Sequence, residues 1–433
     1  MTKFKNNILI KNIIILLVSG AVTKIIGMLG KIIYTRQAGV DVVSLYTLII
    51  PTFMLIMSLC QFSFPISISK LAAEGKYDNK KLLISAYTIG FIIDIILMLL
   101  VIIFSKPIAG MLHNEILYKA IVSISFIIPF VTISSIQRGF LHGKEKMLPA
   151  AISNIIEEII KIILIVIFLP LAIVKSDITA VCVIILFNVL TELSSIIIMQ
   201  KSINKLITKK AIKQDKKIIK DIIGISAPTT LIRLISSIGF FLEPIILTKV
   251  LISDGYSPAY ITLEYGIINS YIIPLLSMPS FFSLSIASAL LPNITKAYST
   301  RQYNEFKRKL LKLLSLSMFV GALCISIIMI MPDLVLEIIY GVSFGINYIY
   351  LIGPFFIILY MQPALTAAIQ ASGKTNKLFF VSLISTILKY TCLIIFGIFG
   401  FGMNCLIFSV ITGIIVTTAL DIIIVLKEIR KRP

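Results

Sequence analysis

Ionisable side chains occur inside several long apolar stretches of this sequence, and they are the residues best placed to do chemistry. The stretch IIEEIIK, which starts at Ile155, carries three of them. An ionisable group at the centre of a bilayer costs about 2.5–3.5 kcal/mol even on insertion scales, so it normally faces protein, water or a ligand. The basic candidates are Lys24, Lys31, Lys161, Arg233 and Lys389, and the acidic candidates are Asp94, Glu157, Glu158 and Glu192.

The five basic residues form a candidate binding set for an anionic substrate. Lys24 and Arg233 each lie about 20 Å along an apolar stretch from the last flanking lysine, at 1.5 Å per residue. Lysine can bind a phosphate through the single charge of its ammonium group, and arginine can bind it through two parallel N–H donors of its guanidinium group. We therefore expect Lys24, Lys161, Arg233 and Lys389 to line a cavity. Lys31 also belongs to the set, although reaching toward the membrane interface is an equally good interpretation for it.

The acidic candidates have two open interpretations. Glu157 lies four residues before Lys161, so an ion pair within one helix is geometrically available, whereas Glu158 points about 100° away from Glu157. A carboxylate without such a partner could instead carry a proton or a sodium ion that is coupled to a conformational change. Asp94 and Glu192 are weaker candidates for that coupling role, and simple charge neutralisation is the favoured interpretation for the glutamate pair.

The sequence around these charges is that of a membrane protein. Hydrophobic residues make up 58% of the 433 residues, only 14% are charged, and the mean hydropathy is +1.03. About twelve apolar windows are long enough to cross a hydrocarbon core of about 30 Å. They are too uniformly apolar to be the strands of a membrane barrel, in which apolar and polar residues alternate. An all-α integral membrane fold is predicted. The expected spans are 10–34, 43–69, 82–104, 119–141, 147–172, 179–200, 219–249, 264–295, 311–331, 347–371, 377–399 and 403–426.

Cysteine and histidine give no sign of a metal site or a disulfide framework. The five cysteines fall within apolar spans and form no CxxC pair, and the two histidines, His113 and His142, are isolated. No GxxxxGK[ST] sequence occurs, so ATP-driven pumping by this chain alone is not expected. We expect no enzyme activity, no metal, and no cofactor beyond possible proton or sodium coupling.

The distribution of basic residues predicts the orientation of the chain. The net charge is +20, and 30 of the 40 Lys and Arg residues fall in the two termini and in alternate connections. By the positive-inside rule, both termini should be cytoplasmic in a multi-pass protein of the cell membrane. The lysine-rich run 201–220 is predicted to be a cytosolic linker against anionic lipid headgroups rather than a nucleic-acid site.

This linker predicts a six-helix lobe at 1–200 and a second at 221–433. LHGKEKML from Leu141 matches ASGKTNKL from Ala371, and IEEIIK at 156–161 lines up with ISTILK at 384–389. ISKLAAEGKYDNKKL likewise matches ITKAYSTRQYNEFKRKL. An even number of spans per lobe gives both lobes the same orientation, which is a parallel repeat of the kind that encloses a substrate cavity.

Three segments carry a resemblance to a known family. QRGFLHGKEKMLPAAISNIIEEIIKI, SGAVTKIIGMLGKIIYTRQAG and SALLPNITKAY resemble the stage V sporulation protein B group of polysaccharide transporters. That group is classed with multidrug and toxic compound extrusion (MATE) exporters and lipid II flippases, which have two six-helix lobes. Many relatives have fourteen spans, so a lipid-tail groove built by two further helices is not carried over.

The resemblance implies a flippase or transporter that moves a lipid-linked or anionic saccharide, such as a cell-wall or polysaccharide precursor, by alternating access. A drug or cation exporter of the same superfamily is the alternative, and a membrane-embedded saccharide-processing enzyme is less favoured. A sporulation role follows only from the resemblance. The expected partners are the saccharide and anionic membrane lipids, without nucleic acid, and the oligomeric state stays open.

Overall fold

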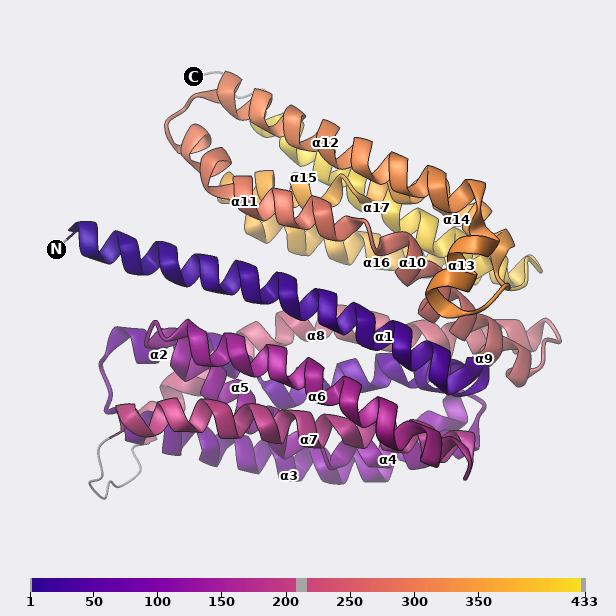
Figure 1. Cartoon of the computed structure of the whole chain (residues 1–433), viewed down its shortest axis with the longest axis horizontal. Coiled ribbons are helices and arrows are strands. Elements are labelled where there is room, and N and C mark those ends of the chain that lie inside the picture. Colours follow the sequence, from indigo (N-terminus) through magenta and orange to yellow (C-terminus); the bar gives the residue numbers. More distant parts are fainter. Residues whose placement is uncertain (1, 208–215, 430–433) are drawn as a thin grey trace. The chain divides into compact units, whose positions relative to one another are not determined.

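The computed structural model describes residues 2–207 and 216–429 of the protein. All regular elements in this part of the chain are helices (Figure 1), which confirms the predicted all-α membrane class. Helices satisfy every internal backbone group within one segment, as an apolar environment requires.

Residue contacts divide the chain into two compact units, Met1–Leu242 and Glu243–Pro433, which we call unit 1 and unit 2. The division falls inside α8 (Lys216–Ser253), because the first part of this helix buries Ile218 and Ile222 in an apolar core of unit 1. The predicted lobes and linker stay a prediction. Residues 208–215 of that linker lie outside the described part of the chain.

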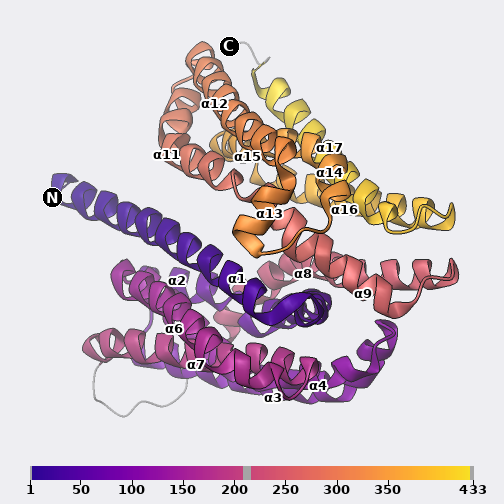
Figure 2. The same cartoon turned by 45° about the vertical axis from the view of Figure 1, so that its right-hand side comes forward.

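Unit 1 is built from long helices that pack side by side, most extensively α6 on α7 and α1 on α6 (Figures 1 and 2). Besides the first part of α8, its elements are α1 (Thr2–Gln61), α2 (Phe64–Glu74), α3 (Asn79–Met111), η1 (Glu115–Leu117), α4 (Tyr118–Ser125), α5 (Ile128–Gly143), α6 (Met147–Ile173), α7 (Asp177–Ile203) and η2 (Asn204–Leu206).

Unit 2 contains shorter helices at its start and a long closely packed pair, α16 and α17, at its end. Its elements after α8 are α9 (Pro258–Gly266), η3 (Ile267–Ile272), α10 (Ile273–Ser277), α11 (Ser280–Ser299), α12 (Tyr303–Ile330), α13 (Pro332–Tyr340), α14 (Ile346–Leu359), α15 (Gln362–Ala371), α16 (Thr375–Ile398) and α17 (Asn404–Ile429). The echo noted in the sequence falls on the α5–α6 turn and the α15–α16 turn.

In the described residues, eight helices are long and apolar enough to cross a membrane, or nine if the bent pair 115–143 counts as one span. Three differences explain why this count is lower than the twelve predicted spans. The first predicted span and most of the second lie in α1, interrupted at Gly39 with φ 74 and ψ 167, a conformation suited to glycine. The predicted span 147–172 is α6, which carries three charges, and the predicted span 264–295 is divided among α9, η3, α10 and α11.

The exposed surface of the long helices is apolar, as expected of a multi-pass membrane protein. On α3, for example, Phe91, Ile95, Leu99 and Ile103 are exposed at intervals of four residues, which forms one continuous apolar stripe. Such a stripe has no favourable contact with water, and it matches the hydrocarbon of a bilayer.

The second predicted span, 43–69, is not one continuous helix. Helix α1 ends at Gln61, and α2 begins at Phe64. Between them Phe62 and Ser63 have left-handed φ angles of 41° and 48°. Non-glycine residues rarely adopt this region, so the break is a strained feature held by its surroundings.

Candidate functional site

A cluster of charged residues lies among α5, α6 and α7 in unit 1. Arg138 of α5 forms an ion pair with Glu157 of α6 at 2.7 Å, and its guanidinium lies 3.4 Å from the Ser195 hydroxyl of α7. Glu192 of α7 interacts electrostatically with both partners of this pair and with Lys161. The Glu157 carboxylate is therefore paired with Arg138 of the facing helix α5 rather than with Lys161 of its own helix.

Arg138 is the member of this cluster that sequence reasoning missed. It stands near the end of the predicted span 119–141, where a basic residue is expected to reach the membrane surface. In the structure the helix α5 continues to Gly143, which places Arg138 more than one turn inside the helix. Its pairing with Glu157 could have been suspected, because a turn of only three residues makes α5 and α6 neighbours.

Helices α1 and α6 cross closely at two glycines of α1. A Cβ atom on Gly27 would lie 3.3 Å from the Glu158 carboxylate, and one on Gly30 would lie 3.0 Å from Ile162. Gly27 and Gly30 thus allow a close contact between the two helices. A Cβ on Gly20, earlier in α1, would have no atom within 4 Å.

Three predicted cations belong to this pair of helices. Lys24 of α1 is exposed, whereas Lys31 of α1 and Lys161 of α6 are half-buried. Among the described residues, no carboxylate oxygen lies within 4.0 Å of any of the three ammonium groups. Glu158 and Glu192 both interact electrostatically with Lys161. We call Lys24, Lys31 and Lys161 the α1–α6 lysines.

The predicted cation of unit 2, Lys389 of α16, is neutralised inside that unit. Its ammonium group pairs with Glu243, which is only 1% exposed. The hydroxyl of Tyr265 also donates to Glu243, and the aliphatic part of Lys389 packs over Gly413 of α17. Lys161 and Lys389 correspond in sequence, but only Lys389 has a carboxylate partner among the described residues.

Arg233 is a member of a polar seam between α8 and the break at the end of α1. Its guanidinium donates to the Gln61 side chain at 2.8 Å. The spacing of four, three and four residues puts the α8 members of the seam on one face. The other pairs are Ser226 with Ser67 at 2.7 Å, Thr230 with Ser63 at 3.1 Å, and Ser237 with Ser58 at 2.8 Å.

Asp94 lies apart from the Arg138 cluster, on α3. It is 4% exposed and accepts a hydrogen bond from Thr132 of α5 at 2.6 Å. It also lines a cavity of about 590 Å³ among α3, α5 and α7. Of the four acidic candidates, Glu157, Glu158 and Glu192 are thus brought together, whereas Asp94 belongs to a different site.

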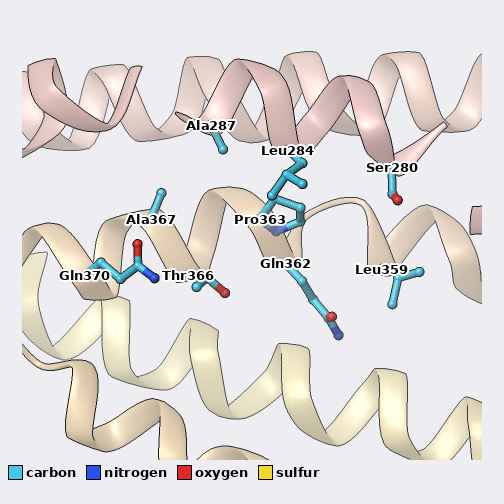
Figure 3. A pocket seen from close by; sticks show the side chains of 9 residues that line it. All are labelled: Ser280, Leu284, Ala287, Leu359, Gln362, Pro363, Thr366, Ala367 and Gln370. Atoms are coloured by element: carbon cyan, nitrogen blue, oxygen red, sulfur yellow. The ribbon is translucent and has the colours of Figure 1, made fainter. Parts of the chain in front are cut away.

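Unit 2 contains an uncharged pocket of about 410 Å³ between α11 and α15. Thr366 and Gln370 contribute a hydroxyl and an amide from α15, and Ser280 contributes a hydroxyl from the start of α11 (Figure 3). Gln362 points away from α11 in Figure 3 and donates to Thr418 of α17 at 3.2 Å. Such groups form hydrogen bonds without adding charge.

Comparison of the sequence with protein families matches residues 9–298 to a family described as "Polysaccharide biosynthesis protein". Two similar proteins come from Bacillus subtilis (strain 168). Stage V sporulation protein B is 28% identical, over 95% of this chain and 82% of that protein. Sporulation protein YkvU is 24% identical, over 98% of this chain and 96% of that protein.

Solved structures share the fold. The lipid II flippase MurJ in an inward closed conformation has a TM-score of 0.72 at 16% identity, with 95% of this chain and 88% of that chain covered. A multidrug resistance MATE family transporter in an inward-facing conformation has a TM-score of 0.67 at 16% identity, with 93% of each chain covered. At this level of identity the similarity is one of architecture.

Proposed function

Because the chain belongs to the polysaccharide biosynthesis protein family, we propose that it is a flippase that moves a lipid-linked saccharide across the cytoplasmic membrane by alternating access. The substrate class is a sugar joined to a lipid through phosphate or diphosphate. Transport, rather than catalysis, and cytoplasmic termini are parts of the same proposal.

The α1–α6 lysines are the observation that carries the proposal. Three cations at one helix crossing have no carboxylate within 4.0 Å among the described residues, whereas Arg138 and Lys389 are ion-paired. An uncompensated ammonium group in a membrane helix is costly, and a bound anion relieves that cost. The negative charge of a diphosphate would be neutralised by these three lysines, each of which binds phosphate through its single ammonium charge.

The uncharged pocket of unit 2 supports the saccharide part of the proposal. Its hydroxyl and amide groups, Ser280, Thr366 and Gln370, are of the kind that bind sugar hydroxyls. The roles of the ion-paired Arg138 and Lys389 are different. We assign to them the stabilisation of their own units, and we assign to Lys24 and Lys161 the contact with phosphate.

A flipping assay with the purified protein in liposomes tests this assignment. The substrate is a fluorescent polyprenyl diphosphate saccharide, and the readout is its protection from a membrane-impermeant reagent. Lys24→Ala and Lys161→Ala should each slow flipping roughly 10- to 100-fold, the loss expected when a hydrogen bond to a charged group is removed, at about 1.5–3 kcal/mol. Lys24→Arg should retain most of the rate, because it keeps the charge.

Lys175→Ala is the matched control, because Lys175 is exposed in the turn between α6 and α7. It should flip at the wild-type rate. Wild-type rates in both Lys24→Ala and Lys161→Ala would remove the phosphate assignment. Absence of flipping by the wild type, together with export of cationic drugs, would favour the multidrug exporter instead.

A further inference from the structure

We propose that unit 1 binds the headgroup of an anionic phospholipid in a pocket at the end of α3, where the ammonium groups of Lys106 and Lys119 are the partners of its phosphate. The pocket has a volume of about 500 Å³. Its lining residues, from α3, η1 and α4, are Lys106, Gly110, Glu115, Ile116, Tyr118 and Lys119. The α1–α6 lysines are not among them, and the test of this site requires no saccharide.

A tight turn brings the two lysines to one pocket. Helix α3 ends at Met111, and His113 adopts a left-handed φ of 50°. The His113 amide donates to the Gly110 carbonyl at 3.0 Å. The next amide, of Asn114, donates to the Ala109 carbonyl at 3.1 Å. These two bonds form a Schellman motif, which satisfies the last carbonyls of a helix. The chain therefore reverses at once, and η1 and α4 pack back against α3.

The length of α3 places Lys106 at the level of the lipid headgroups. Lys81, in the basic connection at the start of the helix, is 25 residues before Lys106. At 1.5 Å per residue this separation is about 38 Å, which is longer than a hydrocarbon core of about 30 Å and close to the full bilayer thickness of about 40–45 Å. The exposed residues from Phe91 to Phe104 are all apolar. In the orientation proposed above, Lys106 is therefore in the outer leaflet.

The pocket carries a positive charge that its own residues do not cancel. In the part of the chain that the structure describes, no carboxylate oxygen lies within 4.0 Å of either ammonium group, although Glu115 lines the same pocket. The Lys106 ammonium lies 5.9 Å from the centroid of the Tyr118 ring, a contact that orients the lysine and keeps its charge. Two cations and one carboxylate leave one net positive charge, which matches the single negative charge of a phosphodiester.

The surroundings of the pocket favour a lipid over a free anion. One face of α3 carries, at intervals of four, three and four residues, Leu99, Ile103, Lys106 and Gly110. Leu99 and Ile103 are 56% and 65% exposed and belong to the apolar stripe of this helix. A hydrocarbon chain that lies along the stripe therefore ends at the pocket. Glu115 can accept hydrogen bonds from headgroup hydroxyls, so phosphatidylglycerol is the lipid that matches all of these groups.

Fluorescence quenching by brominated lipids tests the site. The chain contains no tryptophan, so Leu99→Trp introduces a single tryptophan on the stripe beside the pocket. This parent variant is reconstituted in phosphatidylcholine vesicles that contain either phosphatidylglycerol or phosphatidylcholine with brominated chains, at equal mole fraction. We expect stronger quenching by brominated phosphatidylglycerol. Added to the parent, Lys106→Gln and Lys119→Gln should each lower the relative affinity for phosphatidylglycerol roughly fivefold, the usual effect of one lysine at an anionic lipid surface.

Two further variants separate the pocket from general surface charge. Gly110→Leu keeps every charge, and its side chain enters the pocket, since a Cβ at Gly110 meets no atom within 4 Å. It should abolish the preference. Lys175→Gln removes a charge from the α6–α7 turn, outside the pocket, and should leave the preference unchanged.

Three results would each overturn the proposal. They are equal quenching of the parent by the two brominated lipids, a full preference in Gly110→Leu, and an equal loss in Lys175→Gln and Lys106→Gln. All the replaced residues are exposed, so each variant should fold.

Discussion

Arg138 and Glu157 face each other across the α5–α6 hairpin, with 2.7 Å between guanidinium and carboxylate. In this ion pair the two charges neutralise each other within unit 1, so neither is free to bind a ligand. Because Arg138 neutralises Glu157, the neighbouring Lys161 keeps its charge for another partner. The function that we propose depends on this division between ion-paired and unpaired cations.

Removal of Arg138 should destabilise the protein. Arg138→Ala leaves the half-buried Glu157 without its partner, and we expect a loss of about 1–3 kcal/mol in the free energy of unfolding. Arg138→Gln combined with Glu157→Gln should recover most of this loss, since no charge is then left unpaired. Unfolding by SDS in mixed micelles, followed by circular dichroism, measures both. A double variant no better than Arg138→Ala would contradict the pairing.

Lys389 and Lys161 should behave differently when each is replaced by alanine, although they align in sequence. Lys389→Ala leaves Glu243, which is 1% exposed, as an unpaired buried charge, and should cost about 3–5 kcal/mol. Lys161→Ala should change the free energy of unfolding by less than about 1 kcal/mol, because no ion pair is lost. The same SDS unfolding measurement compares them. Equal losses would show that the unit 2 ion pair contributes little.

Two glycines form a matched pair for a test of helix packing. A Cβ on Gly143 would lie 2.4 Å from the Ser69 carbonyl oxygen, so Gly143→Ala must push α5 away from α2 and should cost about 1–3 kcal/mol. Gly20→Ala meets no atom within 4 Å and should stabilise α1 by about 0.5–1 kcal/mol. Thermal unfolding of both variants should shift in opposite directions, and a shift in the same direction would argue against this packing.

The seam along α8 can be tested by cross-linking. The hydroxyl oxygens of Ser58 and Ser237 are 2.8 Å apart, so cysteines at these positions should form a disulfide with little backbone movement. The five native cysteines are replaced first, and a protease site is placed in the run 201–220. The two fragments should stay joined after cleavage until a reductant is added. Separation without reductant, as in either single-cysteine control, would contradict the seam.

Hydrophobicity was enough to predict the membrane class and most of the long helices. Lipid forces backbone groups to pair within each segment, so a long apolar run has one stable solution. The sequence also singled out Lys24, Lys161 and Asp94 as unusual, because the cost of a charge in an apolar run is a local property. Breaks such as Phe62–Ser63 were not predictable from hydrophobicity, since both residue types are common inside helices of membrane proteins.

The partner of each charge, in contrast, was decided only by the tertiary structure. Helical spacing made an ion pair between Glu157 and Lys161 available, but Glu157 pairs with Arg138 of the facing helix instead. Lys389 has no acidic neighbour on its own helix, and packing within unit 2 gives it Glu243, distant in sequence. Asp94 gained the Thr132 hydroxyl, which comes from a facing helix, in the same way. Local sequence determines where a charge is costly, but the contacts that compensate it come from other helices, and those contacts exist only once the helices have packed.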